Sequence, residues 1–107
     1  MNAAAIRELN DAFRSTFAGG RIVLSAGIVA LPDMVKAATM LAVTGYTAFD
    51  TDDDPYGEHD FGSIEVCQRR IFWKIDYYSP SMDAGSEDPA DPTKTLRVLT
   101  IMLAEEY

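Results

Sequence analysis

The residues with the most chemical potential in this chain lie between positions 50 and 60, in the segment DTDDDPYGEHD. This segment holds six carboxylates, the only histidine of the chain, and neither lysine nor arginine. Clustered carboxylates repel one another, so folding them into one place requires a metal ion, a basic partner or free solvation. Solvation alone implies no function, so three functional alternatives are considered: calcium binding, an enzyme, ligand or metal site around the histidine, and binding to a basic protein.

Calcium binding is the first alternative, because Asp50, Asp52 and Asp54 match the first three ligand positions of an EF-hand loop. The next key position requires glycine and here is Pro55, and the last requires a bidentate glutamate and here is Phe61. The pattern therefore argues against an EF-hand, and weak divalent binding by the clustered carboxylates stays open.

An enzyme, or a small-ligand or transition-metal site, centred on Glu58, His59, Asp60 and Asp76 is the second alternative. In an extended strand His59 points away from its neighbours Glu58 and Asp60, and the hairpin predicted below brings it diagonally towards Asp76. One imidazole and one carboxylate fall short of a zinc site, so no cofactor is predicted. The candidate ligand or metal residues are Glu58, His59, Asp60, Lys74, Asp76 and Tyr78.

Nucleophilic catalysis has less support, and no catalytic residue is predicted. Cys67 lies eight residues from His59, about 26 Å along an extended strand at ~3.3 Å per residue. Because Cys67 is the single cysteine, the chain forms no internal disulfide, and a cytoplasmic location is favoured. We expect Cys67 to be a buried residue or to lie at an edge of the fold.

A basic protein partner is the third alternative, and a second acidic segment supports it. Residues 79–91 contain four carboxylates and no base, and their serine and proline content indicates a surface loop. The predicted partner-binding residues from both segments are Asp50, Asp52, Asp53, Asp54, Glu58, Asp83, Glu87 and Asp88.

Hydrophobic periodicity supplies the elements that would position these loops. It predicts helices over residues 3–17 and 32–45, the first ended by Gly19 and Gly20 and carrying Arg7, Asp11 and Arg14 on its polar side. It predicts strands over residues 21–25, 60–67 and 70–78, with a further short strand at 46–49. Asp91-Pro92 resembles a helix start, which predicts a third helix through Leu103, with a strand as the competing interpretation.

The second and third of these longer strands predict a hairpin with Gln68 and Arg69 as its turn. This turn would place Val66 opposite Ile71, Ile64 opposite Trp73, Gly62 opposite Ile75 and His59 opposite Tyr78. Trp73 would then be buried. Taken together, the sequence predicts one α+β domain over residues 1–107, with a small, mainly antiparallel sheet of three or four strands packed by about three helices.

Charge and hydropathy exclude several function classes. With 107 residues and a net charge of -8, the chain repels DNA, RNA and anionic membranes at long range and attracts basic protein surfaces. No stretch approaches the roughly 20 apolar residues of a membrane span. The sequence leaves the oligomeric state open.

Four segments together resemble a small bacterial family, domain of unknown function family 3768. They are IRELNDAFR (6–14), DPYGEHDFG (54–62), FWKIDYY (72–78) and DPADPTKTLRVLTIMLAEEY (88–107), and Ser79 departs from the aspartate usual in that family. The resemblance implies no activity, but it implies a setting on plasmids and other mobile elements. That setting suggests an anti-defence inhibitor of the anti-CRISPR or antirestriction kind, whose target would be a basic, nucleic-acid-binding defence complex.

Overall fold

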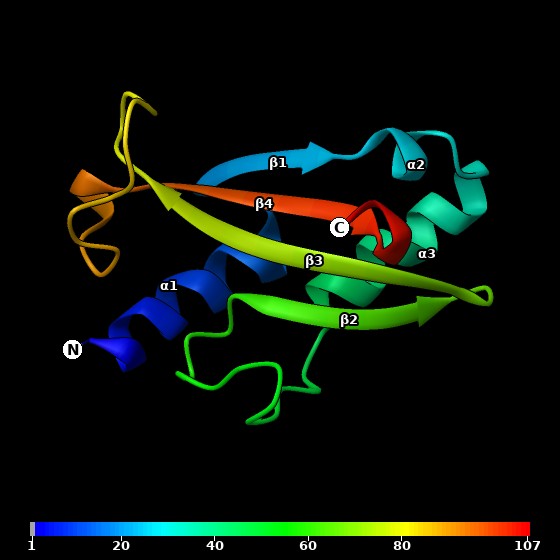
Figure 1. The fold of residues 1–107 in the computed structure, drawn as a ribbon, viewed down its shortest axis with the longest axis horizontal. Helices are drawn as coiled ribbons and strands as arrows, with labels where there is room; N and C mark the ends of the chain where they lie inside the picture. The colour runs from blue at the N-terminus through cyan, green and yellow to red at the C-terminus, as the bar shows by residue number, and fades with distance from the viewer. Residues whose placement is uncertain (1) are drawn as a thin grey trace.

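The computed structural model describes residues 2–107 and contains one four-stranded sheet with helices on one face (Figure 1). The longer helices are α1 (Ala3–Thr16) and α3 (Asp33–Thr44), and α2 (Ala26–Val29) is a single turn. The strands are β1 (Gly20–Leu24), β2 (Phe61–Val66), β3 (Arg69–Tyr78) and β4 (Leu96–Leu103). Two 3-10 turns, η1 (Pro92–Lys94) and η2 (Ala104–Glu106), flank β4. The predicted α+β class is confirmed.

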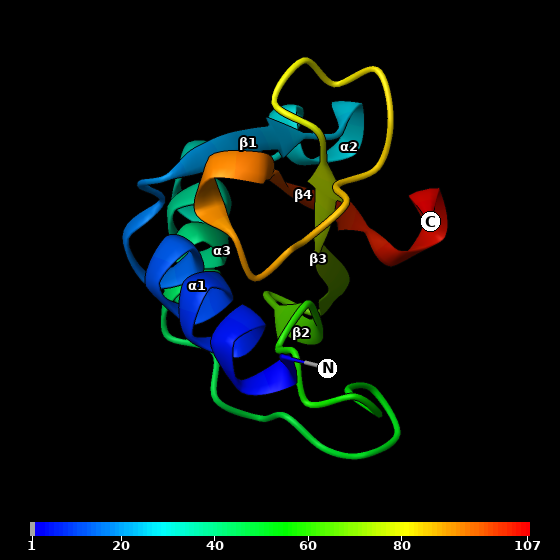
Figure 2. The ribbon, with the colours of Figure 1, turned by 90° about the vertical axis from the view of Figure 1, so that its left-hand side faces the viewer.

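The strand order is β1-β4-β3-β2, with β1 parallel to β4 and the other pairs antiparallel. Figure 2 shows α1 and α3 on the same side of the sheet, while the opposite face carries no long helix. The core lies between these helices and the face of the sheet that they cover. Its fully buried members include Ile71, Trp73, Leu99, Ile101, Ile28 and Val43.

The two longer helices lie close to their predicted positions. α1 ends one residue early, because Phe17 adopts the left-handed conformation (φ 59°) that the sequence assigned to the following glycines. α3 has Asp33 in its first turn and Gly45 as its C-terminal cap, as predicted, and Pro32 immediately precedes it. Residues 46–49, predicted as a strand, are irregular.

The predicted third helix is wrong, because residues 96–103 form β4 between β1 and β3. The run LRVLTIML is apolar almost throughout, and such a run suits either a buried helix or a strand covered on both faces. Its central place in the sheet selects the strand. Asp91 caps only the η1 turn, where its carboxylate accepts a hydrogen bond from the Thr93 amide at 2.9 Å.

The hairpin is confirmed, but its register differs by two positions from the predicted one. The turn consists of Cys67 and Gln68, both with positive φ (50° and 66°), which is typical of a type I′ turn. Cys67 is therefore exposed in the turn, not buried or in a strand. A shift of two keeps every side chain on its predicted face, so Trp73 is fully buried as expected.

The new register places Gly62 opposite Trp73, and Ile64 opposite Ile71. A Cβ atom at position 62 would lie 2.2 Å from the Trp73 indole nitrogen, so only glycine leaves room for this ring. The core therefore depends on this pairing of a small and a large residue across the hairpin.

Candidate functional site

The acidic segment 50–60 forms a compact loop before β2, held by its own carboxylates. The Asp50 carboxylate accepts hydrogen bonds from the amides of Asp52 and Asp53, both at 2.9 Å. The Asp50 carbonyl accepts the Asp54 amide at 2.8 Å. This turn leaves the side chains of Asp50, Asp52 and Asp53 exposed to solvent.

Asp54 differs from its neighbours because its side chain is buried. Its carboxylate accepts the His59 amide at 3.1 Å and lies 3.7 Å from His59 Nε2. Asp54 therefore closes the loop from inside, and little of it is left to contact a partner.

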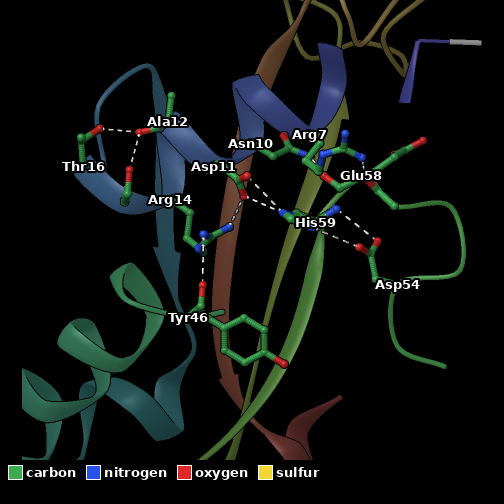
Figure 3. Close-up of polar contacts among 12 residues, drawn as sticks. Arg7, Asn10, Asp11, Ala12, Arg14, Thr16, Tyr46, Asp54, Glu58 and His59 are labelled. Atoms are coloured by element: carbon green, nitrogen blue, oxygen red, sulfur yellow. Dashed lines mark hydrogen bonds and ion pairs between the residues drawn. The ribbon is translucent and has the colours of Figure 1, made fainter. Parts of the chain in front are cut away.

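His59 is held on the helical side of the sheet (Figure 3). Its Nδ1 lies 2.9 Å from an oxygen of Asp11 on α1, and its ring stacks on Phe49 with centroids 3.6 Å apart. The predicted place in a strand opposite Tyr78 is wrong: His59 lies before β2 and has a positive φ of 56°, which an extended strand does not allow. The carboxylates beside its ring are those of Asp11 and Asp54, and Asp76 instead forms an ion pair with Lys74.

Arg14 on α1 completes this cluster. Helical periodicity predicts it on the polar side of the helix, and this prediction is wrong because the side chain is buried. Its guanidinium is buried, lies 5.2 Å from the ring centroids of both Phe49 and Trp73, and donates to Asp11 at 3.0 Å. It also donates to the Tyr46 carbonyl at 3.3 Å. Stacking on aromatic rings lets arginine be buried while its charge stays paired.

A second polar cluster joins α1 to β3 and β4. The buried amide of Asn10 donates to the Tyr77 hydroxyl at 2.8 Å and to the Glu58 carbonyl at 2.9 Å, and accepts from Arg97 Nε at 2.7 Å. Tyr77 in turn donates to the Glu58 carboxylate at 2.8 Å. Burial raises the pKa of Tyr77 and lowers the pKa of Arg97.

Sequence reasoning missed Asn10, Tyr77 and Arg97. The available signal was an asparagine in the middle of a predicted helix and an arginine within an apolar run, both unusual unless paired.

Three other predicted residues lie on the opposite, open face of the sheet. Asp60, Lys74 and Asp76 line a pocket of about 310 Å³ together with residues of the acidic loop. Lys74 and Asp76 form an ion pair of 2.9 Å, which raises the pKa of the lysine. Burial and the nearby charge of Glu58 raise the pKa of the Asp60 carboxyl.

The predicted ligand set is thus divided by the sheet. Glu58 and His59 contact α1 or residues that pack on it, whereas Asp60, Lys74 and Asp76 face the pocket on the other side. Tyr78 pairs with Leu96 at the end of β3. Within residues 2–107, no three His, Cys, Asp or Glu side chains are grouped so that they could hold a metal ion.

The second acidic loop, residues 79–91, is ordered by similar local contacts. The hydroxyls of Ser79 and Ser81 both donate to Asp83 at 2.8 Å, which lowers the pKa of that carboxyl. Glu87 lies 3.4 Å from Lys94, and Asp88 accepts the Ala90 amide at 3.1 Å. All three carboxylates are exposed.

Both acidic loops adjoin strand ends that lie away from the hairpin turn, and Figure 2 shows the loop after β3 at the top and the loop before β2 at the bottom. One loop enters β2 at Phe61, the other leaves β3 at Tyr78, and the antiparallel register pairs Phe61 with Lys74, near the end of β3. Figure 1 shows both loops near the ends of β2 and β3 that lie away from the hairpin turn. The partner-binding role of their carboxylates remains a prediction.

The fold and these clusters define a small α+β protein with a half-covered sheet, whose acidic loops adjoin the strand ends away from the hairpin turn. The chain belongs to the family described as Protein of unknown function (DUF3768), whose model matches residues 24–106. The segment 6–14, which also suggested the resemblance, lies outside that match. No curated protein and no solved structure matches the chain. In the part of the chain that the structure describes, no helix is long and apolar enough to cross a membrane.

Proposed function

We propose that this chain is a non-enzymatic binding module that engages a basic surface of another protein through its two acidic loops. The observation that carries the proposal is that both acidic segments, residues 50–60 and 79–91, adjoin the ends of β2 and β3 that lie away from the hairpin turn. Neither segment contains a lysine or an arginine. Among residues 2–107, the exposed carboxylates of these segments make one ion pair, that of Glu87 with Lys94 at 3.4 Å.

The exposed residues between these carboxylates support a protein partner. Tyr56 is 79% exposed and Met82 is 40% exposed, one in each loop. Tyrosine and methionine are enriched in protein interfaces, and carboxylates around them favour partners of opposite charge. This combination fits a protein surface better than a nucleic acid, whose phosphates the net charge of -8 repels.

The implied setting on mobile elements suggests a more specific partner. A basic groove that normally holds nucleic acid in a host defence complex would match these acidic loops in charge. The protein would then act by occupying the groove, as an anti-CRISPR or antirestriction protein would, in the cytoplasm. This part of the proposal rests on the resemblance and on charge complementarity.

The test compares two variants that each lose three negative charges. The loop variant carries Asp52→Asn, Glu87→Gln and Asp88→Asn, all exposed carboxylates of the acidic loops. The control variant carries Asp33→Asn, Glu65→Gln and Glu105→Gln, also exposed but near the hairpin turn and the opposite ends of the strands. Asp54 is left intact because it is buried.

Affinity capture from a bacterial host extract, with each protein immobilised, provides the readout. Wild type and the control variant should retain the same partner at low salt, and the loop variant should lose it. The captured partner should also lose nucleic-acid binding when wild type is added. Equal retention by the loop and control variants would contradict the proposal.

A further inference from the structure

A pocket lies between the acidic loop 50–60 and the open face of the sheet, and its lining combines carboxylates with aromatic rings. Its volume is about 310 Å³. The carboxylates are those of Asp53, Asp60 and Asp76, and the rings are those of Tyr56, Phe61 and Tyr107. Tyr107 is far in sequence from Tyr56 and Phe61, so this lining is a product of the tertiary structure.

The charges in this pocket are unbalanced. Lys74 is the one base among the lining residues, and it pairs with Asp76 at 2.9 Å. Asp60 belongs to no ion pair among residues 2–107, although its side chain is half-buried. Partial burial without a cation raises the pKa of its carboxyl, so an incoming positive charge would stabilise the ionised form.

Two of the three aromatic rings that line the pocket are largely exposed to solvent. Tyr56 and Tyr107 are 79% and 76% exposed. Behind them, Phe61 contacts Phe72 with ring centroids 5.3 Å apart, and Phe72 contacts Tyr107 at 5.5 Å. Aromatic faces beside carboxylates attract a cation that has a flat, weakly hydrated surface.

The chain itself pairs arginine with aromatic rings in this way elsewhere. Arg14 lies 5.2 Å from the centroids of Phe49 and Trp73 while it donates to Asp11. Arg97 lies 5.3 Å from the Tyr77 centroid. In both cases ring faces and polar acceptors together accommodate a guanidinium, and the pocket is lined by the same kinds of group.

We propose that this pocket binds an arginine side chain presented by the basic partner protein. The inference rests on the proposed function and deepens it, because it names the residue type that the partner must supply. A guanidinium suits the site better than an ammonium, since it can bind a carboxylate with two parallel hydrogen bonds while its plane stacks on tyrosine. The exposed aromatic cluster then becomes the contact surface for the residues around that arginine.

The test uses an acetylated and amidated Gly-Arg-Gly peptide as the probe and its citrulline counterpart as the control. Citrulline keeps the shape of arginine but carries no charge. Titration of ¹⁵N-labelled protein by NMR should show saturable shifts for the arginine peptide, centred on Tyr56, Asp60, Phe61 and Lys74. The citrulline peptide should bind at least five-fold more weakly.

Two variants and a matched control complete the experiment. Tyr56→Ala and Asp60→Asn should each weaken binding of the arginine peptide at least three-fold, whereas Asp52→Asn, in the same loop but outside the pocket, should leave it within two-fold. Because Tyr56 is largely exposed, its variant should keep the folded NMR spectrum. Equal binding of the arginine and citrulline peptides, or unchanged binding in both pocket variants, would overturn the proposal.

This outcome is separable from the test of the proposed function, because none of the three positions changed in the loop variant lines the pocket. If the loop variant loses the captured partner but the arginine peptide does not bind the pocket, the arginine site is refuted and the binding module stands. If the peptide binds as expected but the loop and control variants capture the partner equally, the general acidic-surface proposal is refuted. The arginine site is then supported as an isolated site only.

Discussion

At the scale of single residues, the Trp73 ring occupies the space that a side chain at position 62 would need. Among the glycines, a Cβ atom added at Gly62 would make the shortest contact, 2.2 Å. The indole is fully buried against the backbone of the neighbouring strand. Large aromatic side chains dominate small cores, so the space for this ring has an effect on the stability of the whole domain.

Gly62→Ala should therefore lower the free energy of unfolding by about 1–3 kcal/mol, the usual cost of overpacking a core. The new methyl carbon would lie 2.2 Å from the Trp73 nitrogen, and both atoms belong to a packed sheet. Urea unfolding followed by tryptophan fluorescence measures the change. Gly85→Ala is the control, since the nearest atom there is 3.9 Å away. A loss no larger than that of the control would contradict this packing.

Asp60 should affect the pH dependence of stability through its raised pKa. Between its unfolded and folded pKa values the native state binds more protons, so this residue makes the free energy of unfolding fall as pH rises. Asp60→Asn removes this contribution to the fall of the free energy of unfolding with pH. Relative to wild type, the variant should become more stable as pH increases through the acid range, as measured by urea unfolding at several pH values. A relative stability that falls with rising pH would show the opposite shift.

At the scale of elements, α1 is attached to the sheet by polar contacts as well as by its apolar face. Asn10 connects it to β3 through Tyr77 and to β4 through Arg97. Asp11, which accepts a hydrogen bond from Arg14, connects it to His59. The acidic loop is therefore positioned by a helix that lies far from it in sequence.

Asn10→Ala should lower the free energy of unfolding by about 1–3 kcal/mol, because buried groups on Tyr77 and Arg97 would each lose a hydrogen-bond partner. The measurement is chemical denaturation. NMR should also show altered signals for Glu58 and His59, since the loop loses one attachment. Glu8→Ala, at an exposed position of the same helix, should change stability by no more than about 0.5 kcal/mol. Equal effects of the two changes would remove this role of Asn10.

At the scale of the whole molecule, the two acidic loops and the arginine pair of the hairpin lie at opposite ends of β2 and β3. Both acidic loops adjoin the strand ends away from the hairpin turn, whereas Arg69 and Arg70 lie beside that turn. Such an asymmetric field orients an approaching basic partner before contact and raises the association rate.

Association with a deca-lysine peptide should therefore slow as salt increases, because exposed charges are screened beyond about 8 Å at physiological ionic strength. At low salt, the loop variant (Asp52→Asn, Glu87→Gln, Asp88→Asn) should bind the peptide more slowly than wild type. The control variant (Asp33→Asn, Glu65→Gln, Glu105→Gln) should be affected less, although its net charge is the same. Stopped-flow fluorescence of a labelled peptide gives these rates. Identical rates for the two variants would show that only net charge matters.

The sequence by itself determined the features that depend on local periodicity and turn chemistry. Alternating apolar residues placed Trp73 and its neighbours on the buried face, and the helices over residues 3–16 and 33–44 followed from their spacing and caps. A hairpin register error of two positions left those faces unchanged, because strand side chains alternate with a period of two.

The tertiary structure alone decided whatever depended on neighbours distant in the chain. The apolar run 96–103 became a strand because β1 and β3 flank it, a fact that its own residues do not contain. The same holds for His59, which meets Asp11 from α1, and for Arg14, which is buried because Phe49 and Trp73 offer it ring faces. Local spacing specifies which face a side chain occupies, but long-range packing specifies which group it contacts, and the chemistry of the site depends on those contacts.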